Sequence, residues 1–253
     1  MDSSFEWLKT YNFISFETTT STNDQAFNLA KENISCHHVI SAKSQSAGRG
    51  SKGRQWISEE GNLYFSILLV RFDDIAHATM FSFMMANIVA DVLDDYILGK
   101  ENIVIELKWP NDILLNQKKI AGILVESTTI NDINYVVIGV GVNVNHYPIL
   151  DERRIIPSSL FKEGVIISDI QIFLNKLINQ FDRQYKIWQQ HKNFDLIKDY
   201  WLSRAYKLGD EVNINLAGKD RTGIFRGLGM DGQLIMQLPN NGDIIYYYSG
   251  ELT

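Results

Sequence analysis

Glycines and cationic side chains are interleaved in one short stretch, residues 46–56, which reads SAGRGSKGRQW. From Lys43 to Arg54 the chain carries four cations, with Arg49 and Lys52 between them, and no acidic residue. Glycine lets backbone N–H groups approach an anion without a Cβ in the way, and arginine offers a forked donor to carboxylate or phosphate. In a chain of net charge −6, this stretch indicates a localised site for a small anion. A solvated basic loop is the alternative.

The glycines of this stretch spell G-x-G-x-x-G, the pattern of a dinucleotide-binding turn. That interpretation requires a helix directly after the glycines, whereas residues 54–70 lead into an apolar strand pattern. A P-loop would need Lys-Ser or Lys-Thr after Gly53, where Arg54 and Gln55 stand, and the HRD and DFG triplets of protein kinases are absent from the sequence. We therefore expect a loop between two strands that is mobile when empty and ordered by its ligand.

The composition excludes several classes of protein. The 253 residues are 45% hydrophobic and 21% charged, which is ordinary for a globular protein. No apolar run approaches the ~18 residues of a membrane span, and the N-terminus lacks the pattern of a secretory signal. The single cysteine, Cys36, excludes an internal disulfide framework. The acidic balance argues against general nucleic-acid binding. We expect a cytoplasmic protein with no membrane partner.

The elements that must position this loop follow from periodicity. Helices are expected after a capping box at Thr22 and Gln25, over 75–97, over 168–188 with a second capping box at Ser168 and Gln171, and in a short segment ending near Ala205. Strands are expected at 37–42 and 61–72, and 103–127 reads as a strand and a hairpin with turns at 110–111 and 116–117. The sequence therefore predicts a mixed α and β domain.

Residues 134–145, NYVVIGVGVNVN, form a strand pattern whose two faces differ. Alternate positions from Val136 to Val144 are bulky and suited to a core. The other face carries Gly139 and Gly141 and then Asn143. A face cleared by glycine lets another group approach the sheet closely, so we expect a neighbour or a ligand there.

The last fifty residues change character. Four short strand patterns within residues 211–250 are joined by turn signals at 217–218, 231–232 and 241–242. We expect a small β-barrel. Residues 1–204 are predicted to be the catalytic domain, and residues 205–253 the C-terminal barrel domain.

Five blocks occur in order: STN (21–23), the loop at 46–56, KWPND (108–112), KKIAGILVE (118–126) and IGVGVNVN (138–145). With a β-rich tail ending in SGEL, they resemble the bacterial biotin–protein ligases of the BirA type, over nearly the whole chain from about residue 12. A single glycine-rich block would be weak evidence for the family, but five blocks in the same order are specific evidence. The resemblance implies an α+β fold: a mixed β-sheet with helices, related to class II aminoacyl-tRNA synthetases, plus a small C-terminal SH3-like β-barrel.

The resemblance also implies a biotin–[acetyl-CoA-carboxylase] ligase that works in two steps. The biotin carboxylate attacks the α-phosphate of ATP, with Mg²⁺, and gives biotinyl-5′-AMP and pyrophosphate. A lysine of the biotin carboxyl carrier protein of acetyl-CoA carboxylase then attacks the mixed anhydride. Fixed positive charge and oriented donors suit a reaction that brings two anions together. Members of the family dimerise through sheet edges, so a homodimer is compatible with the resemblance.

The site residues are carried over block by block. Lys119, which would reach the biotin carboxylate and the α-phosphate, and Arg49, which would contact the activated carboxylate, are the catalytic candidates. The expected biotin-binding residues are Ser21, Thr22, Asn23, Gln45, Arg49, Gly50, Ser51, Lys119 and Gly122. The expected ATP- and adenylate-binding residues are Arg49, Lys52, Arg54, Trp56, Asn111, Asp112 and Asn143, and Mg²⁺ would reach Asp112. Structural alternatives stay open: helix capping for 21–23, core packing for Trp56 and a turn at 110–112.

Two features depart from the family pattern. A second arginine usually follows the middle glycine of the loop and helps to retain the adenylate, whereas Ser51 and then Lys52 stand here. We therefore expect modest leakage of biotinyl-adenylate. Only about eleven residues precede the catalytic blocks, too few for the N-terminal winged helix-turn-helix of repressor-type members, so no DNA-binding role is expected.

Two other functions remain open at this point. Lipoate–protein ligases and octanoyl transferases share the fold but lack the full GRG…GR.W loop. A non-catalytic regulator that binds biotinyl-adenylate is the alternative from another class, and the intact Lys119 and Arg49 weigh against it.

Overall fold

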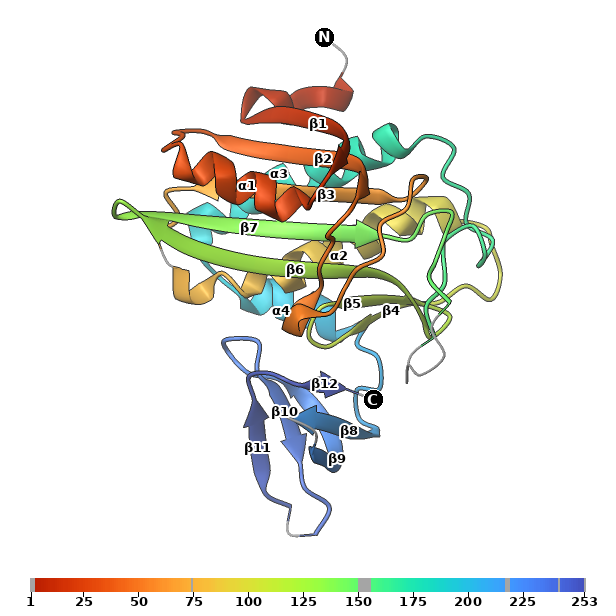
Figure 1. Ribbon diagram of the computed structural model, residues 1–253. Coiled ribbons are helices and arrows are strands. Elements are labelled where there is room, and N and C mark those ends of the chain that lie inside the picture. Colours follow the sequence, from red (N-terminus) through yellow and green to blue (C-terminus); the bar gives the residue numbers. More distant parts are fainter. Residues whose placement is uncertain (1–2, 74, 150–155, 217–218, 241, 253) are drawn as a thin grey trace.

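A mixed sheet of seven strands forms the centre of the molecule, and Figure 1 shows how it is arranged. The computed structural model describes residues 3–73, 75–149, 156–216, 219–240 and 242–252. The strand order is β1-β2-β3-β7-β6-β5-β4, and β1 and β2 pair in parallel while the other neighbours are antiparallel. The strands are β1 (Tyr11–Thr19), β2 (His37–Gln45), β3 (Leu63–Val70), β4 (Ile105–Lys108), β5 (Asp112–Leu115), β6 (Lys118–Ile130) and β7 (Ile133–Val142). The mixed sheet predicted from the sequence is confirmed.

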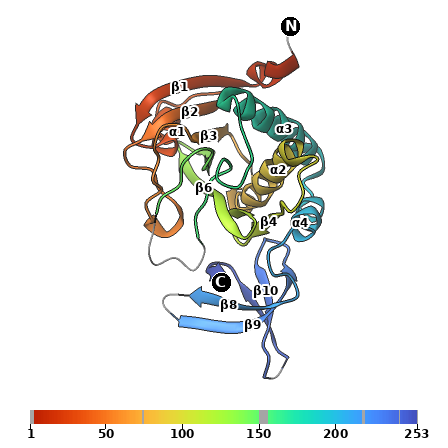
Figure 2. The same ribbon diagram turned by 90° about the vertical axis from the view of Figure 1, so that its right-hand side faces the viewer.

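The two faces of this sheet carry unequal layers (Figure 2). Helix α1 (Thr22–Lys31) covers one face through a small apolar cluster that includes Ala26 and Ala30. The other face supports the main core, formed with α2 (Met80–Ile97) and α3 (Ile170–His191), and α4 (Asp195–Leu202) packs on α2. The described residues also contain the 3-10 helices η1 (Ser3–Lys9), η2 (Ser51–Gly53) and η3 (Ile75–His77). The large core fixes the sheet, and the thin layer leaves room for a site beside α1.

Both predicted capping boxes are wrong in detail. Helix α1 has Ser21 as its N-cap without a side-chain cap bond, and the N–H of Thr22 instead donates to Gln45 Oε1 of β2 at 2.8 Å. Helix α3 is capped by Asp169 and not by Ser168, because the Asp169 side chain accepts from two backbone N–H groups of the first turn. A capping box is a local rule, and at α1 a neighbouring strand supplies the acceptor.

The C-terminal strands form a second sheet, with the order β11-β10-β9-β8-β12. They are β8 (Glu211–Leu216), β9 (Lys219–Leu228), β10 (Leu234–Gln237), β11 (Ile244–Tyr247) and β12 (Glu251–Leu252). No pairing between β11 and β12 closes this sheet into a barrel within the described residues, so the small β unit is confirmed but its expected closure is not seen. The predicted turn at 231–232 is present, while 217–218 and Asn241 lie outside the described residues.

The second sheet is joined to the first by a continuous core. Leu107 exchanges backbone hydrogen bonds with Arg204 and Tyr206, and Trp109 Nε1 donates to the carbonyl oxygen of Gly232 at 2.9 Å. Buried side chains of both sheets belong to one apolar cluster. Within the described residues no helix is long and apolar enough to cross a membrane.

His37, the first residue of β2, is expected to make the stability of the fold pH-dependent. Its Nδ1 accepts from the N–H of Val70 at 3.0 Å, and burial lowers the pKa of His37 below 6.5. Because the unfolded chain then takes up a proton first, the free energy of unfolding should fall as the pH drops below that value. Urea unfolding at about pH 7.5 and about pH 5.5 should show a larger loss in the wild type than in His37→Gln. Equal losses in the two proteins would contradict this assignment.

Candidate functional site

A hollow of about 620 Å³ opens between α1, the glycine loop and the ends of β6 and β7. Predicted site residues that line it are Ser21, Thr22, Asn23, Gln45, Arg49, Gly50, Ser51, Arg54, Trp56, Asn111, Lys119 and Gly122. Three other predicted residues do not line it: Lys52, Asp112 and Asn143. The tertiary fold therefore brings residues from all five sequence blocks to one place.

The glycine-cleared face of β7 forms the floor of this hollow. A Cβ on Gly139 would lie 2.2 Å from Asn23 Oδ1, and one on Gly141 would lie 2.6 Å from Trp56 Nε1. Gly122, which pairs with Gly141 across the sheet, would meet the same indole at 3.0 Å. The close neighbours expected from the alternation in β7 are therefore Asn23 and Trp56.

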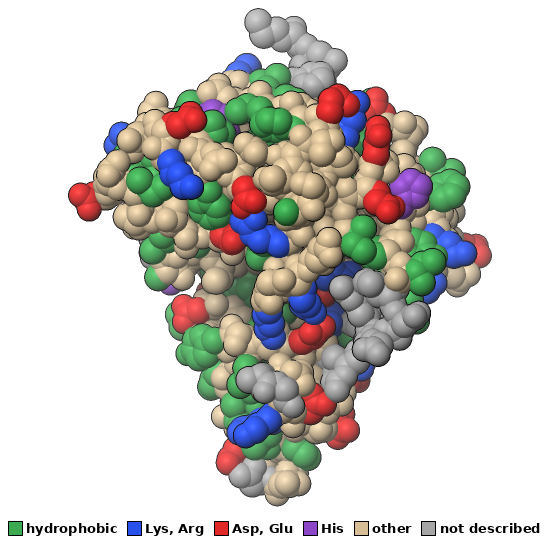
Figure 3. Space-filling model, in the orientation of Figure 1, with side chains coloured by type: hydrophobic (Ala, Val, Ile, Leu, Met, Phe, Trp, Pro, Cys, Tyr) green, Lys and Arg blue, Asp and Glu red, His purple; other side chains and the backbone are tan. Residues whose placement is uncertain are grey.

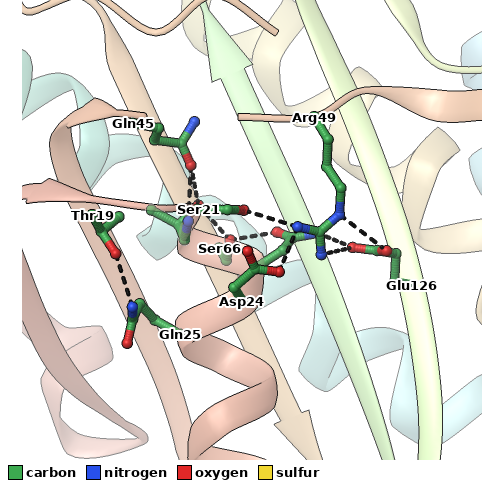
Figure 4. Close-up of polar contacts among 10 residues, drawn as sticks. Thr19, Ser21, Asp24, Gln25, Gln45, Arg49, Ser66 and Glu126 are labelled. Carbon is green, nitrogen blue, oxygen red and sulfur yellow. Dashed lines mark hydrogen bonds and ion pairs between the residues drawn. The ribbon is translucent and has the colours of Figure 1, made fainter. Parts of the chain in front are cut away.

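The start of α1 is held by a chain of buried hydrogen bonds (Figure 4). Ser21, Thr22 and Asn23 are each buried. Ser66 Oγ of β3 lies 2.6 Å from Asn23 Oδ1 and 2.7 Å from Thr22 Oγ1, and Asn23 Nδ2 donates to Glu126 Oε2 at 2.7 Å. These side chains form a rigid polar wall, so capping geometry and a ligand-binding role are compatible here.

Gln45 extends this wall to the loop. Its Oε1 accepts from the N–H of Thr22, and its Nε2 donates to Ser58 Oγ at 2.9 Å. Ser58 Oγ in turn lies 3.0 Å from the carbonyl oxygen of Trp56. The amide of Gln45 thereby fixes the distance between the helix start and the segment that carries Trp56.

The side chain of Arg49 is committed to two carboxylates (Figure 4). Its Nη1 lies 2.5 Å from Asp24 Oδ1, and its Nη2 lies 3.0 Å from Glu126 Oε2. Burial alone would lower the pKa of Arg49, but its bonds with Glu126 and Asp24 raise it above its usual value. Arg49 therefore ties the loop to α1 and β6, and its guanidinium faces protein carboxylates where the sequence analysis expected a ligand anion.

Asp24 and Glu126 are functional candidates that the sequence analysis missed. Asp24 directly follows the block STN, and Glu126 is the last residue of the block KKIAGILVE. Each of these two blocks thus has an acidic residue at its end, although the site was expected to bind anions. That mismatch could have indicated that the two carboxylates pair with a cation of the protein. Only the fold shows that both carboxylates meet the same arginine.

A second hollow of about 350 Å³ adjoins the first. Gln55, Trp56 and Lys119 line both, so they form the partition between them. The far side of the second hollow is formed by Asn143 with Ile57, Pro148 and Pro157. Asn143 is itself held, since its Nδ2 donates to the carbonyl oxygen of Ser158 at 2.9 Å.

Lys119 projects from β6 at this partition. Its Nζ lies 2.6 Å from Asp112 Oδ1 and 5.2 Å from the centre of the Trp56 ring. Asp112 thus lies behind Lys119 rather than in the first hollow. The neighbouring Lys118 points elsewhere, and its Nζ lies 2.9 Å from Glu163 Oε1.

The glycine loop itself is a tight hairpin. The N–H of Gly50 donates to the carbonyl oxygen of Arg54 at 2.7 Å, and Lys52 is exposed with a left-handed φ of 59°. Arg54 reaches the C-terminal sheet, where its Nη1 lies 3.0 Å from Glu251 Oε2. Figure 3 shows Lys and Arg side chains gathered where the larger and smaller parts of the molecule meet. The loop is therefore anchored at Arg49 and again at Arg54.

The donor set for a magnesium ion is sparse. No group of three or more His, Cys, Asp and Glu side chains suited to a metal occurs among the described residues. Asp112, the expected ligand, is already 2.6 Å from Lys119 and 3.9 Å from Lys108. Two cations at one carboxylate do not fit a protein-held metal site, so Asp112 is not assigned as a magnesium ligand.

The two hollows lie side by side on the mixed sheet, and Lys119 lines both of them. Residues 15–143 match the model of the biotin/lipoate A/B protein ligase family, and the chain belongs to that family. The chain is 32% identical over 234 residues to "Biotin--[acetyl-CoA-carboxylase] ligase" of Paracoccus denitrificans, covering 90% of this chain and 95% of that protein.

Two further relatives agree with this assignment. The chain is 31% identical to "Bifunctional ligase/repressor BirA" of Bacillus subtilis, over 95% of this chain and 73% of that protein. A biotin protein ligase from Aquifex aeolicus, solved in complex with biotin and ATP, superposes with a TM-score of 0.77 at 29% identity. The superposition covers 96% of this chain and 97% of that structure.

Breaking the ion pair at Arg49 should loosen the loop. In Glu126→Gln the carboxylate that accepts from Arg49 Nη2 is lost, and we expect tryptic cleavage at Lys52 to become roughly three- to tenfold faster. Time courses followed by mass spectrometry would measure this. Glu17→Gln is the matched control, because Glu17 pairs with Lys43 on the surface. The anchoring role fails if both variants are cleaved at the wild-type rate.

Proposed function

We propose that this protein is an ATP-dependent biotin–protein ligase, which forms biotinyl-5′-AMP and transfers the biotinyl group to a lysine of a biotin carboxyl carrier protein, the acceptor subunit of acetyl-CoA carboxylase. Membership of the biotin/lipoate A/B protein ligase family supports a ligase, and the biotin ligases among the relatives support biotin over lipoate. The proposal includes no DNA or membrane partner.

The observation that carries the proposal is the partition between the two hollows. Lys119 and Trp56 line both, so a ligand in the first and a ligand in the second would meet at the Lys119 ammonium. A reaction between a carboxylate and an α-phosphate needs a fixed positive charge where the two anions meet, because their mutual repulsion opposes the attack. In the proposal, Lys119 lowers that barrier, and Trp56 shields the reacting atoms from water.

The remaining residues divide between the two ligands. The polar wall of Ser21, Thr22, Asn23 and Gln45 binds the ureido ring of biotin, and Gly122 and Gly50 leave room for its tail. In the proposal, Asn143 contacts the adenine in the second hollow, and Asn111 and Arg54, which line the first hollow, contact the phosphates of ATP. Arg49 acts as a positioning residue through Asp24 and Glu126. Magnesium, when bound with ATP, would offset phosphate charge.

The test is ATP–pyrophosphate exchange with biotin and, separately, with lipoate, followed by transfer to a purified carrier domain. Exchange with biotin and labelling of the carrier lysine are expected. Exchange with lipoate alone would assign the protein to the other branch of the family. Tight binding of biotinyl-adenylate without exchange or transfer would assign a regulatory role instead.

Ser51 is expected to determine how well the adenylate is retained. It lines the first hollow and its Oγ lies 3.1 Å from Arg54 Nη2. We predict that Ser51→Arg, which adds a cation at the mouth of the site, reduces the free biotinyl-adenylate trapped by hydroxylamine by roughly threefold or more. Thr18→Arg, on an exposed strand position, is the control for added charge. Equal trapping in all three proteins would show that Ser51 does not govern retention.

We also propose the division into a catalytic domain, 1–204, and a C-terminal unit, 205–253. The change from helices to short strands after α4 supports it. The ion pair between Arg54 and Glu251 supports a role for the C-terminal unit in holding the loop. The proposal includes a homodimer, because members of the family dimerise through sheet edges. Analytical ultracentrifugation would distinguish it from a monomer.

A further inference from the structure

Lys108 is a buried lysine that none of the roles above uses. It is the last residue of β4, its side chain is 2% exposed, and it stands opposite Asp112 in the β4–β5 hairpin. The charged groups that act on it are the acidic Asp112 and Glu251 and the basic Lys119 and Arg54. Burial lowers the pKa of Lys108, with Lys119 and Arg54 acting in the same direction and the two carboxylates opposing them. Burying a charged group lowers the stability of the fold unless a counter-ion or hydrogen bonds compensate for the lost hydration.

The contacts of Asp112 are unequal. Its Oδ1 lies 2.6 Å from Lys119 Nζ, and its Oδ2 lies 3.9 Å from Lys108 Nζ. Asp112 is 9% exposed, so its carboxylate also needs a nearby cation. Lys108, Asp112 and Lys119 together carry two cations and one anion, a net charge of +1, and of the three only Lys119 lines the two hollows.

This arrangement affects how easily Lys119 can pair with a ligand anion. To pair with that anion, the Lys119 ammonium must weaken its 2.6 Å contact with Asp112. Without a second cation, the move would leave a buried carboxylate unpaired, which would oppose ligand binding. Lys108 is already in place to balance Asp112.

We propose that Lys108 is a positioning residue that serves as the resident counter-ion of Asp112 and thereby releases Lys119 to bind the ligand anion. Lys108 touches no ligand in this proposal and acts through Asp112. The inference rests on the proposed function, because the anion is taken to be the carboxylate of biotin.

The experiment compares a charged ligand with its neutral analogue. Calorimetric titration measures the affinity for biotin and for biotinol, in which a hydroxymethyl group replaces the carboxylate. We expect Lys108→Met to weaken biotin binding by roughly 10- to 50-fold and to leave biotinol binding nearly unchanged. Lys108→Arg, which keeps the charge, should retain most of the preference for biotin. Lys118→Met is the matched control, since Lys118 is 42% exposed and pairs with Glu163.

The possible outcomes separate the inference from the function. If the wild type binds biotin no better than biotinol, the proposed role of Lys119 fails before any variant is measured. If the wild type prefers biotin and Lys108→Met keeps that preference, the counter-ion role is overturned. An equal loss for both ligands would mean that Lys108 only supports the fold, which also overturns it. Lys108→Gln, a polar neutral variant, gives the same comparison if Lys108→Met does not fold.

Discussion

Replacing Lys119 by methionine is expected to slow biotin-dependent ATP–pyrophosphate exchange by about 10²- to 10³-fold. The ammonium lies at the partition of the two hollows, 5.2 Å from the centre of the Trp56 ring. Its charge is the one best placed to stabilise negative charge as a carboxylate approaches a phosphate. Methionine keeps most of the apolar stem of the side chain and removes the charge, so the loss should appear chiefly in kcat rather than in stability.

Lys118→Met supplies the comparison for this experiment. The two lysines are adjacent on β6, but Lys118 pairs with Glu163, and the pKa of that carboxyl is held down by Ser158 and Lys118 although burial opposes the shift. We expect near wild-type exchange in Lys118→Met. If Lys119→Met kept more than about a tenth of the wild-type kcat, a role for Lys119 in transition-state stabilisation would be ruled out.

Gly139→Ala is the second substitution with a large expected effect. The new Cβ would lie 2.2 Å from Asn23 Oδ1, so the buried Asn23 must move. Its hydrogen bonds with Ser66 and Glu126 would then break, and the wall at the start of α1 would lose its geometry. Leaving such buried groups unpaired costs about 1–3 kcal/mol, and we expect the KM for biotin to rise by about 10- to 100-fold.

Ile138→Val is the control on the same strand. Ile138 faces the main core, so shortening it should lower the free energy of unfolding by about 0.5–1.5 kcal/mol without changing the KM. Steady-state kinetics and urea unfolding on both variants separate binding from stability. Unchanged kinetics in Gly139→Ala would show that the cleared face is not part of the biotin site.

Local pattern was sufficient for much of this fold. The alternation in 134–145 predicted β7 and its glycine floor, and the helical stripe in 168–188 predicted α3. The left-handed φ values at Asn116 and Gln117 confirm the predicted hairpin turn between β5 and β6. Side-chain periodicity and turn chemistry depend on neighbours a few residues apart, so a sequence can reveal them directly.

Local pattern did not predict the partners of individual side chains. The basic loop suggested that Arg49 meets a ligand anion, yet its guanidinium lies against Asp24 and Glu126, which are 25 and 77 positions away in the chain. Likewise, the N–H of Thr22 was expected to be capped from within its own helix and is bound by Gln45 from β2. Sheet register, not local pattern, decides which distant groups face each other.

The sequence by itself indicated the family, most of the helices and strands that follow β1, and the cleared face of β7, and it predicted Lys119 as the site lysine. Only the tertiary structure decided that Trp56 and Lys119 divide two hollows, and that Asp112 lies between Lys119 and the buried Lys108. The physical reason is the range of the interactions. The periodicity of a segment shows which of its faces is buried. The strength of an ion pair depends instead on the distance between its two charges, and that distance is set by the packing of separate strands.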